Sequence, residues 1–323
     1  MSSRIRSIVF GFIAVLCVLL VVLFLIAQWR WDRHFPVPSM TIHASTDAKL
    51  IERGRYLAYG PAHCVHCHVT VVDGKKMDGF AAPTLAGGRA FVIPPGTIYA
   101  PNITPDPVTG IGTRSDAQLA QFIRYGIHAD GRAAIPFMNF QNLSDEDLLA
   151  LVSFLRSQEA VNHPVPKHEI NLLGKLVLAL IIKPTSPTPS VSVKETDTAL
   201  LRGAYLTNVV AQCATCHTKR NLVDGSFTGP RLAGGMEMES EVNSKWVFVT
   251  PNLTPDKATG RIVTWSREEF IARFRTGEII PHSHMPWRSF STMTDGDLAD
   301  IYAYLQSIPA VQFDPGSPLR EKN

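Results

Sequence analysis

The sequence has little of what several common protein classes require. It contains five cysteines in 323 residues, and four of these form two Cys-x-x-Cys pairs, so no protein disulfide is required. The fifth, Cys17, lies in an apolar run, where it is expected to act as a small hydrophobic residue. The formal net charge of only +3 gives no strong case for a nucleic-acid partner. No Ser-His-Asp set, phosphate-binding loop or flavin fingerprint is present.

A histidine directly follows each cysteine pair. The two motifs are Cys64-Val65-His66-Cys67-His68 and Cys213-Ala214-Thr215-Cys216-His217. Cys-x-x-Cys-His is the attachment sequence of a c-type haem, whose vinyl groups take up the two thiols and whose iron is bound by the histidine. A zinc site would use a second cysteine pair in the same unit, and a thioredoxin-like dithiol lacks the obligatory histidine. We therefore predict two covalently bound haem c groups.

One long apolar stretch, from Ile8 to Ala27, carries no charge and is long enough to cross a bilayer as a helix. Two arginines precede it, and two tryptophans follow it at the depth expected for a membrane interface. A cleavable signal peptide is the alternative, but its apolar core would be shorter and would end in a small-x-small cleavage site. We expect an uncleaved membrane anchor over residues 1–34.

Charge does not decide the orientation of this anchor, because arginines lie on both sides of it. The haem motifs do decide it, since c-type haem is attached outside the bacterial cytoplasm. The chain is therefore expected to be a single-pass protein of the bacterial inner membrane with its soluble part in the periplasm.

The rest of the chain contains an internal duplication. Cys64 and Cys213 lie 149 residues apart, and other matched segments keep nearly the same offset. These segments are Pro83-x-Leu85-x-Gly87-Gly88 with Pro230-x-Leu232-x-Gly234-Gly235, and Pro101-Asn102-Ile103-Thr104-Pro105-Asp106 with Pro251-Asn252-Leu253-Thr254-Pro255-Asp256. The expected organisation is two domains at 48–160 and 197–311, a linker with a short apolar helix at 161–196, and a tail at 312–323.

Helix signals recur in both halves. First helices are expected at about 48–59 and 199–210, capping boxes at Ser115 and Ser266, and last helices after the hydroxyl caps Ser144 and Thr294. Tyr56 and Tyr205 on the first helices are expected to pack as core against Phe154 and Tyr304 on the last. Pro- and Gly-rich loops without sustained alternation lie between the helices, so the expected fold class is all-α.

The linker contains an apolar segment at 172–182, which is too short to span a membrane. A proline-rich spacer at 183–189 follows it. We expect the segment to form a helix packed across the two domains, with contact to a membrane surface or a partner as the alternative.

Each half resembles a class I cytochrome c domain. The pair is similar to the repeated units in the membrane-bound cytochrome c subunits of bacterial alcohol, gluconate and sorbitol dehydrogenases. The shared marks are Cys-x-x-Cys-His, the Pro-Asn-x-Thr-Pro-Asp segment with Thr-Gly after it, and Met285-Pro286-Trp287. The resemblance covers nearly all of 48–160 and 197–311. Those dehydrogenase subunits usually carry three haem domains, whereas this chain has two motifs.

The resemblance implies a partner for each haem-binding histidine. In class I domains that histidine gives its other ring hydrogen to a proline carbonyl downstream, which fixes the ring and raises its basicity. Pro83 is the expected acceptor for His68, and Pro230 is the expected acceptor for His217. The alternative is that both prolines simply stiffen loop turns.

The resemblance also implies a methionine opposite each histidine. In the second half Met285 stands in the family's Met-Pro position, and its competitor Met293 aligns with a core leucine. In the first half Ile135 stands at that position, and Met138, three residues on, is the expected ligand. His128 or an open iron is the alternative there.

These residues favour an electron carrier over an enzyme. Its expected donor is a periplasmic dehydrogenase or a quinol-linked protein, and its expected acceptor is a terminal oxidase or a soluble cytochrome. A dihaem enzyme of the bacterial peroxidase kind is the alternative and needs one open iron, which a plausible methionine in each half argues against. A haem-based sensor is the third class, but the sequence shows no cytoplasmic output domain.

Overall fold

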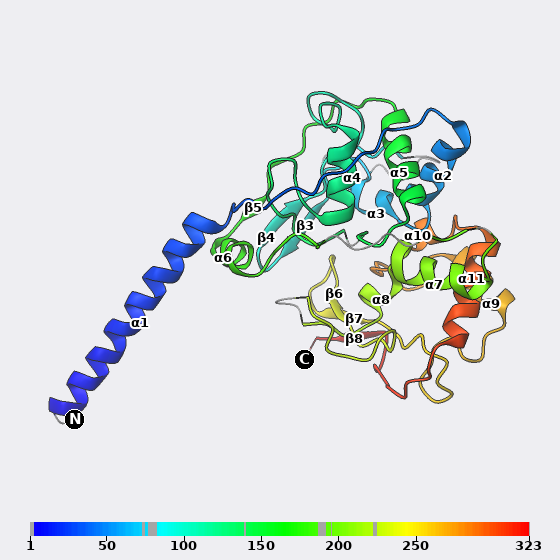
Figure 1. Ribbon diagram of the computed structural model, residues 1–323. Helices are drawn as coiled ribbons and strands as arrows, with labels where there is room; N and C mark the ends of the chain where they lie inside the picture. Colours follow the sequence, from blue (N-terminus) through cyan, green and yellow to red (C-terminus); the bar gives the residue numbers. More distant parts are fainter. Residues whose placement is uncertain are drawn as a thin grey trace.

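A long N-terminal helix extends from a body formed by the rest of the chain (Figure 1). The computed structural model describes residues 3–72, 75–76, 83–138, 140–186, 192–194, 196–221 and 225–322. Helix α1 (Ser3–Arg30) is the one helix in this described part that is long and apolar enough to cross a membrane. Its large apolar side chains from Ile8 to Leu25 are exposed, as expected of a membrane anchor.

The first half of the body, which we define as residues 48–170, is built on two helices packed side by side, α2 (Ala48–Tyr59) and α5 (Asp145–Ser157). The short helix α3 (Cys64–His68) follows α2, and α4 (Asp116–Tyr125) completes the helical part. The expected caps are confirmed: Ser115 forms a capping box with Gln118, and the Ser144 hydroxyl caps α5. Gly54 lets α2 approach α5 closely, because a Cβ there would lie 2.0 Å from the Ala150 carbonyl oxygen.

The second half, residues 199–321, repeats this plan. Helix α7 (Ala199–Tyr205) runs into a π-helical turn (η1, Leu206–Val210) and then α8 (Cys213–Cys216). Helices α9 (Arg267–Thr276), α10 (Trp287–Phe290) and α11 (Asp295–Ser307) follow. Helix α7 packs on α11 through Gly203, where a Cβ would lie 2.0 Å from the Asp300 carbonyl oxygen.

The expectation of an all-α fold is not confirmed, because each half also contains a small antiparallel sheet. The first comprises β3 (Ala90–Ile93), β4 (Gly96–Tyr99) and β5 (Glu169–Ile170), and the second comprises β6 (Glu237–Glu239), β7 (Trp246–Val249) and β8 (Leu319–Glu321). A further two-stranded ribbon joins β1 (Val71–Val72) to β2 (Lys75–Lys76). The strands have two to four residues, too few for a period-two pattern to stand out in the sequence.

The third strand of each sheet comes from a segment that the sequence assigns to the linker or the tail. Strand β5 pairs with β4, with Gly96 opposite Ile170, and β8 pairs with β7, with Phe248 opposite Leu319. The segment after α5 therefore pairs with the first half, and the segment after α11 pairs with the second. The proline-rich spacer at 183–189 lies partly outside the described residues.

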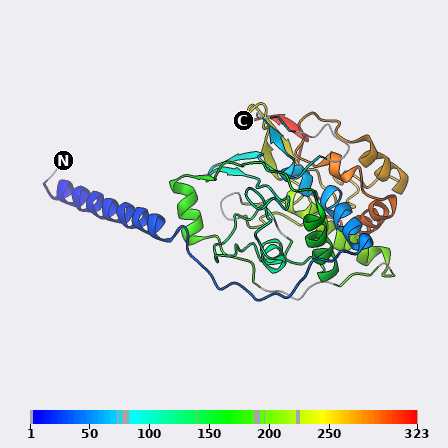
Figure 2. The same ribbon diagram turned by 90° about the horizontal axis from the view of Figure 1, so that it is seen from above.

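Helix α6 (Leu172–Leu180) is not packed across the two halves as expected. It lies against the C-terminal end of α1, between that helix and the body (Figures 1 and 2). Asn171 starts the helix, because its side-chain oxygen accepts from the Gly174 backbone N–H at 2.9 Å.

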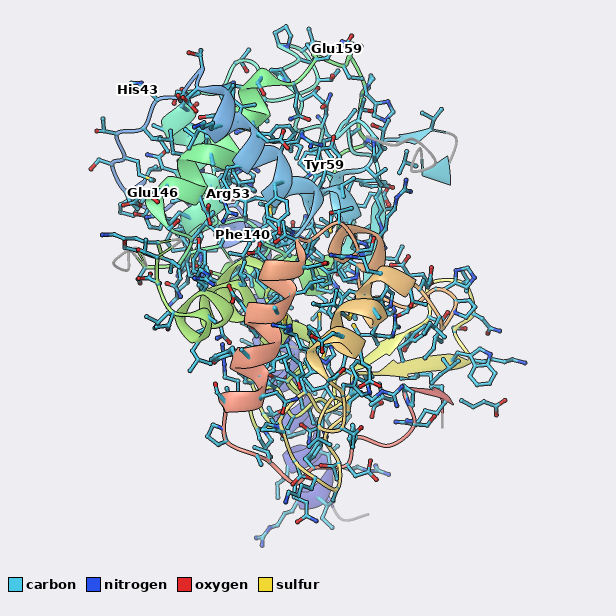
Figure 3. The ribbon with its side chains drawn as sticks, turned by 90° about the vertical axis from the view of Figure 1, so that its right-hand side faces the viewer. His43, Arg53, Tyr59, Phe140, Glu146 and Glu159 are labelled. Carbon is cyan, nitrogen blue, oxygen red and sulfur yellow. The ribbon has the colours of Figure 1, made fainter. Side chains whose placement is uncertain are left out.

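The two halves meet through one continuous buried hydrophobic cluster, which includes Leu57 and Leu148 from the first half and Leu298 and Leu305 from the second. Figure 3 shows the first half above the second, with Phe140 close to their boundary. The His63 ring, next to the first cysteine motif, meets the Phe290 ring of α10 edge-on at a centroid distance of 5.5 Å.

Two tyrosines make reciprocal hydrogen bonds across this boundary. The Tyr56 hydroxyl donates to Asp297 Oδ2 at 2.6 Å and accepts from the Thr294 N–H at 3.1 Å. The Tyr205 hydroxyl donates to Asp147 Oδ2 at 2.8 Å and accepts from the Ser144 N–H at 3.0 Å. Each first helix thus supplies a polar cap to the last helix of the other half, a role that the core interpretation of these tyrosines did not include.

Candidate haem-binding sites

Each cysteine motif begins directly after a residue in the left-handed backbone conformation. His63 has φ 42° before α3, and Gln212 has φ 52° before α8. After this left-handed residue a short helix starts at the first cysteine. The two cysteines, three residues apart, therefore share one helix face. The histidines that follow are both buried, with His68 7% and His217 8% exposed. The two motifs therefore share their starting turn and their buried histidine, although His68 ends α3 and His217 lies just after α8.

Both histidine rings are oriented by a backbone carbonyl. The Nδ1–H of His68 donates to the Pro101 carbonyl oxygen at 2.9 Å, and that of His217 donates to the Pro251 carbonyl oxygen at 3.0 Å. Because a carbonyl oxygen can only accept, the proton lies on Nδ1 and Nε2 keeps its lone pair for a metal. Burial lowers the pKa of both rings, which keeps them neutral and able to bind iron.

The prolines that hold the rings differ from the ones that the sequence pointed to. The Pro83 carbonyl instead accepts from the Tyr59 hydroxyl at 2.8 Å, and the Pro230 carbonyl accepts from the Ala233 N–H at 3.2 Å. The assignment of Pro83 and Pro230 as histidine acceptors is therefore wrong, and their contacts are those of loop turns. The reason is that the Pro101 and Pro251 segments fold back over the histidines from farther along the chain.

The asparagine that follows each acceptor proline holds that segment in a hydrogen-bond network. In the first half, Asn102 donates from Nδ2 to Thr109 Oγ1 at 3.0 Å and to the Val161 carbonyl at 2.8 Å. Its Oδ1 accepts from the Thr104 N–H at 2.9 Å. The second half repeats these three bonds on Asn252. The sequence did carry this signal, because Pro-Asn-x-Thr-Pro-Asp is one of its longest repeated segments.

Three of the four motif thiols have a raised pKa, unlike the thiols of reactive or metal-binding cysteines. Desolvation by burial raises the pKa of Cys64 and of Cys213 to about 12, and it also raises the pKa of Cys216. A redox dithiol or a zinc thiolate needs the opposite shift. In the described part of the chain, no group of three His, Cys, Asp or Glu side chains could hold a bare metal ion. The motif residues therefore fit a thioether-linked haem.

Comparison with known proteins agrees with this chemistry. A model of the family described as "Cytochrome C oxidase, cbb3-type, subunit III" matches residues 199–305. The fructose dehydrogenase cytochrome subunit of Gluconobacter japonicus is 30% identical over 287 residues, covering 84% of this chain and 55% of that protein. This chain is a relative of the cytochrome c subunits of bacterial dehydrogenases.

Two further relatives extend the comparison. The cytochrome c subunit of alcohol dehydrogenase (quinone) from Gluconacetobacter polyoxogenes is 30% identical over 293 residues, covering 84% of this chain and 58% of that protein. A diheme cytochrome c-type protein from Cereibacter sphaeroides is 27% identical over 266 residues, covering 77% of this chain and 83% of that protein. The chain thus spans just over half the length of the two dehydrogenase subunits. These relatives agree with an electron-transfer protein rather than an enzyme.

The methionines expected on the far side of each haem lie in turns. Met285 precedes α10 in a turn closed by the Trp287 N–H on the Met285 carbonyl, at 2.7 Å. Met138 follows a similar short turn, and both side chains are partly buried against the hydrophobic cluster. Met293 is 2% exposed within that cluster, as expected for a core residue. The assignment of Met138 and Met285 as iron ligands stays a prediction.

His128, the alternative ligand in the first half, is partly buried on the Phe122 ring, with a centroid distance of 4.9 Å. Desolvation and the charge of Arg132 lower its pKa to about 4. It is therefore neutral, the form in which a histidine binds a metal.

Proposed function

We propose that the protein is a membrane-anchored electron carrier that holds two haem c groups, one in each half, on the periplasmic side of a bacterial inner membrane. The observation that carries this proposal is the repeated histidine geometry. Each Cys-x-x-Cys-His motif ends in a buried imidazole whose Nδ1–H is bonded to a proline carbonyl, 33 residues downstream in one half and 34 in the other. A ring held in this way presents Nε2 in a fixed direction.

The residues of each half have separate roles in this proposal. Haem c, when bound, supplies one-electron redox chemistry at its iron. Cys64 and Cys67 would hold it covalently in the first half, and Cys213 and Cys216 in the second. The buried histidines would bind the iron, and the prolines behind them would keep the rings from turning. Met138 and Met285 would complete the coordination and exclude other ligands.

The partners follow from the relatives and from the anchor. Two of the relatives are named as cytochrome subunits, one of fructose dehydrogenase and one of alcohol dehydrogenase (quinone). A dehydrogenase subunit or a quinol-linked protein is therefore the proposed donor here. A terminal oxidase or a soluble cytochrome is the proposed acceptor. Periplasmic placement follows from where c-type haem is attached.

The experiment that tests this function is an optical redox titration of the purified holoprotein, with carbon monoxide added to the fully reduced form. A carrier is expected to show two low-spin c-type haems per chain, neither of which binds the gas. Fewer than two haems would overturn the dihaem assignment. Ready binding of carbon monoxide at one haem would overturn the carrier assignment for that half and favour the peroxidase-type alternative.

The sixth ligands can be tested one at a time with methionine-to-leucine substitutions, which conserve side-chain volume. Met285→Leu is expected to lower the potential of one haem and open it to carbon monoxide, and Met138→Leu to do the same to the other haem. Met293→Leu in the core is the matched control and should change neither property. Unchanged potentials in Met285→Leu would refute that ligand assignment.

A further inference from the structure

Helix α6 is fixed against the end of the membrane anchor by tight packing and polar bonds. Ala27 of α1 and Ala179 of α6 are both fully buried. The Lys175 ammonium donates to Gln28 Oε1 at 2.9 Å and lies 5.4 Å from the centroid of the Trp31 ring. These contacts set α6 at the level where the apolar part of α1 ends.

That level corresponds to the edge of a bilayer. The uncharged stretch from Ile8 to Ala27 is helical, and at a rise of about 1.5 Å per residue it spans roughly 30 Å, the thickness of a hydrocarbon core. Ala27, Gln28 and Trp31 therefore lie where acyl chains give way to headgroups. Helix α6 crosses the anchor at this depth.

The direction of α6 is across α1 rather than along it. Figure 1 shows α1 lengthwise and α6 nearly end-on, whereas Figure 2, from above, shows α6 lengthwise and crossing the line of α1. If α1 spans the membrane, α6 therefore runs along the membrane plane.

Helix α6 and the residue after it leave four large apolar side chains open. Leu172, Leu173 and Leu180 of α6, and Ile181 directly after it, are each 40–48% exposed. The exposed apolar surface of α1 lies beside them, because α6 packs against α1, whose Ala27 is fully buried at the end of that surface. Contiguous apolar patches of this kind on a protein surface mark an interaction site.

We propose that α6 is an in-plane membrane helix, with these four apolar side chains embedded at the boundary between acyl chains and headgroups of the lipid bilayer. Helices of this type bury their apolar side about 5–10 Å into that boundary. The occupant is lipid because the patch continues the lipid-facing surface of α1 at the matching depth. The inference rests on the membrane anchoring in the proposed function.

The in-plane helix would also orient the first half. Asn171 at the start of α6 donates from Nδ2 to the Pro94 carbonyl at 2.8 Å, in the turn between β3 and β4. The segment after α1 is bonded to the same half, since Gln121 Nε2 donates to the Pro38 carbonyl at 2.7 Å. Two attachments at different points would hold the first half at a fixed tilt to the bilayer, which a single spanning helix would not do.

The test places spin labels on the full-length holoprotein in phosphatidylcholine–phosphatidylglycerol nanodiscs. Single cysteines are introduced as Leu173→Cys and Leu180→Cys in a Cys17→Ala background, because the haem cysteines do not react once they are thioethers. Val92→Cys and Val108→Cys, at positions 83% and 81% exposed in the first half, are the matched water-facing controls. Native Cys17, labelled in the wild-type sequence, reports on the anchor itself.

Power saturation with oxygen and with a water-soluble nickel complex gives the depth of each label. We expect the oxygen-to-nickel accessibility ratio at 173 and 180 to be several-fold above that at 92 and 108, and lower than at Cys17. Nickel accessibility at 173 and 180 equal to that of the controls, with Cys17 still deep, would overturn the in-plane helix and leave the patch as a protein contact. A water-accessible Cys17 would instead overturn the anchoring on which the inference rests.

Discussion

At the scale of single residues, the amide of Asn252 ties the proline behind His217 to the segment that follows α11. It is fully buried and bonds to Thr254, to Thr259 and to the Val311 carbonyl. Asn252→Ala removes every one of these bonds and leaves buried polar groups unpaired, so we expect it to lower the free energy of unfolding by about 1–3 kcal/mol. Urea titration of the holoprotein measures this loss.

The position of Asn252 next to Pro251 adds a second expected effect. A looser Pro251 carbonyl orients His217 less well, so the potential of one haem should shift while the other stays unchanged. Asn243→Ala, which removes one exposed bond from the Lys245 N–H in a loop of the same half, is the matched control; it should leave both potentials unchanged and lower the free energy of unfolding far less. Equal stability and equal potentials in both variants would refute the positioning role.

The identity of the haem-binding histidines was evident from the motif, whereas their acceptors were not. The motif fixes His68 and His217 by adjacent residues alone. The acceptor is a backbone carbonyl, which every residue has, and the fold decides which one reaches the ring. The repeated asparagine after Pro101 and Pro251 was the only residue-level clue to those carbonyls.

At the scale of elements, the contact of α7 with α11 depends on the missing side chain of Gly203. A Cβ there would lie 2.0 Å from the Asp300 carbonyl oxygen, so Gly203→Ala must push two helices apart. We expect a loss of about 1–3 kcal/mol in the free energy of unfolding. Gly296→Ala in the first turn of α11 meets nothing closer than 3.9 Å and should instead be neutral or stabilising, by up to about 1 kcal/mol. Thermal unfolding of the two holoproteins should separate them, and equal melting temperatures would contradict the packing argument.

The helices were predictable because their signals are local. The caps at Ser115, Ser144, Ser266 and Thr294 bond to backbone within three residues, and the structure has all four. The small sheets depend on distant partners instead. Strand β4 ends at Tyr99, while its partner β5 begins at Glu169, and no short window of sequence contains both.

At the scale of the whole molecule, the reciprocal tyrosines predict that the two halves unfold together. Tyr205→Phe removes the donor to Asp147 and the acceptor for the Ser144 N–H, both of which are buried. We expect this variant, combined with Tyr56→Phe, to separate the unfolding of the holoprotein into two transitions, one for each half.

The matched control is Tyr304→Phe, since the Tyr304 hydroxyl accepts from Asn208 within the second half. It should lower the stability of that half without separating the transitions. Differential scanning calorimetry resolves the two cases. A single transition in the double tyrosine variant would show that the apolar cluster alone couples the halves.

Because the tyrosine of each half caps the last helix of the other, neither half would keep all these bonds alone. In an isolated first half, Tyr56 would lose its acceptor, while Ser144 and Asp147 would lose the hydroxyl that covers them. Two copies of that half could satisfy each other, because Tyr56 of one copy would meet in the other the same hydroxyl-capped, acidic helix start that it meets in Thr294 and Asp297. The boundary between the halves thus has the form of an isologous dimer interface, in which a single patch is complementary to itself. The protein can be regarded as a symmetric dimer whose two subunits have become one polypeptide.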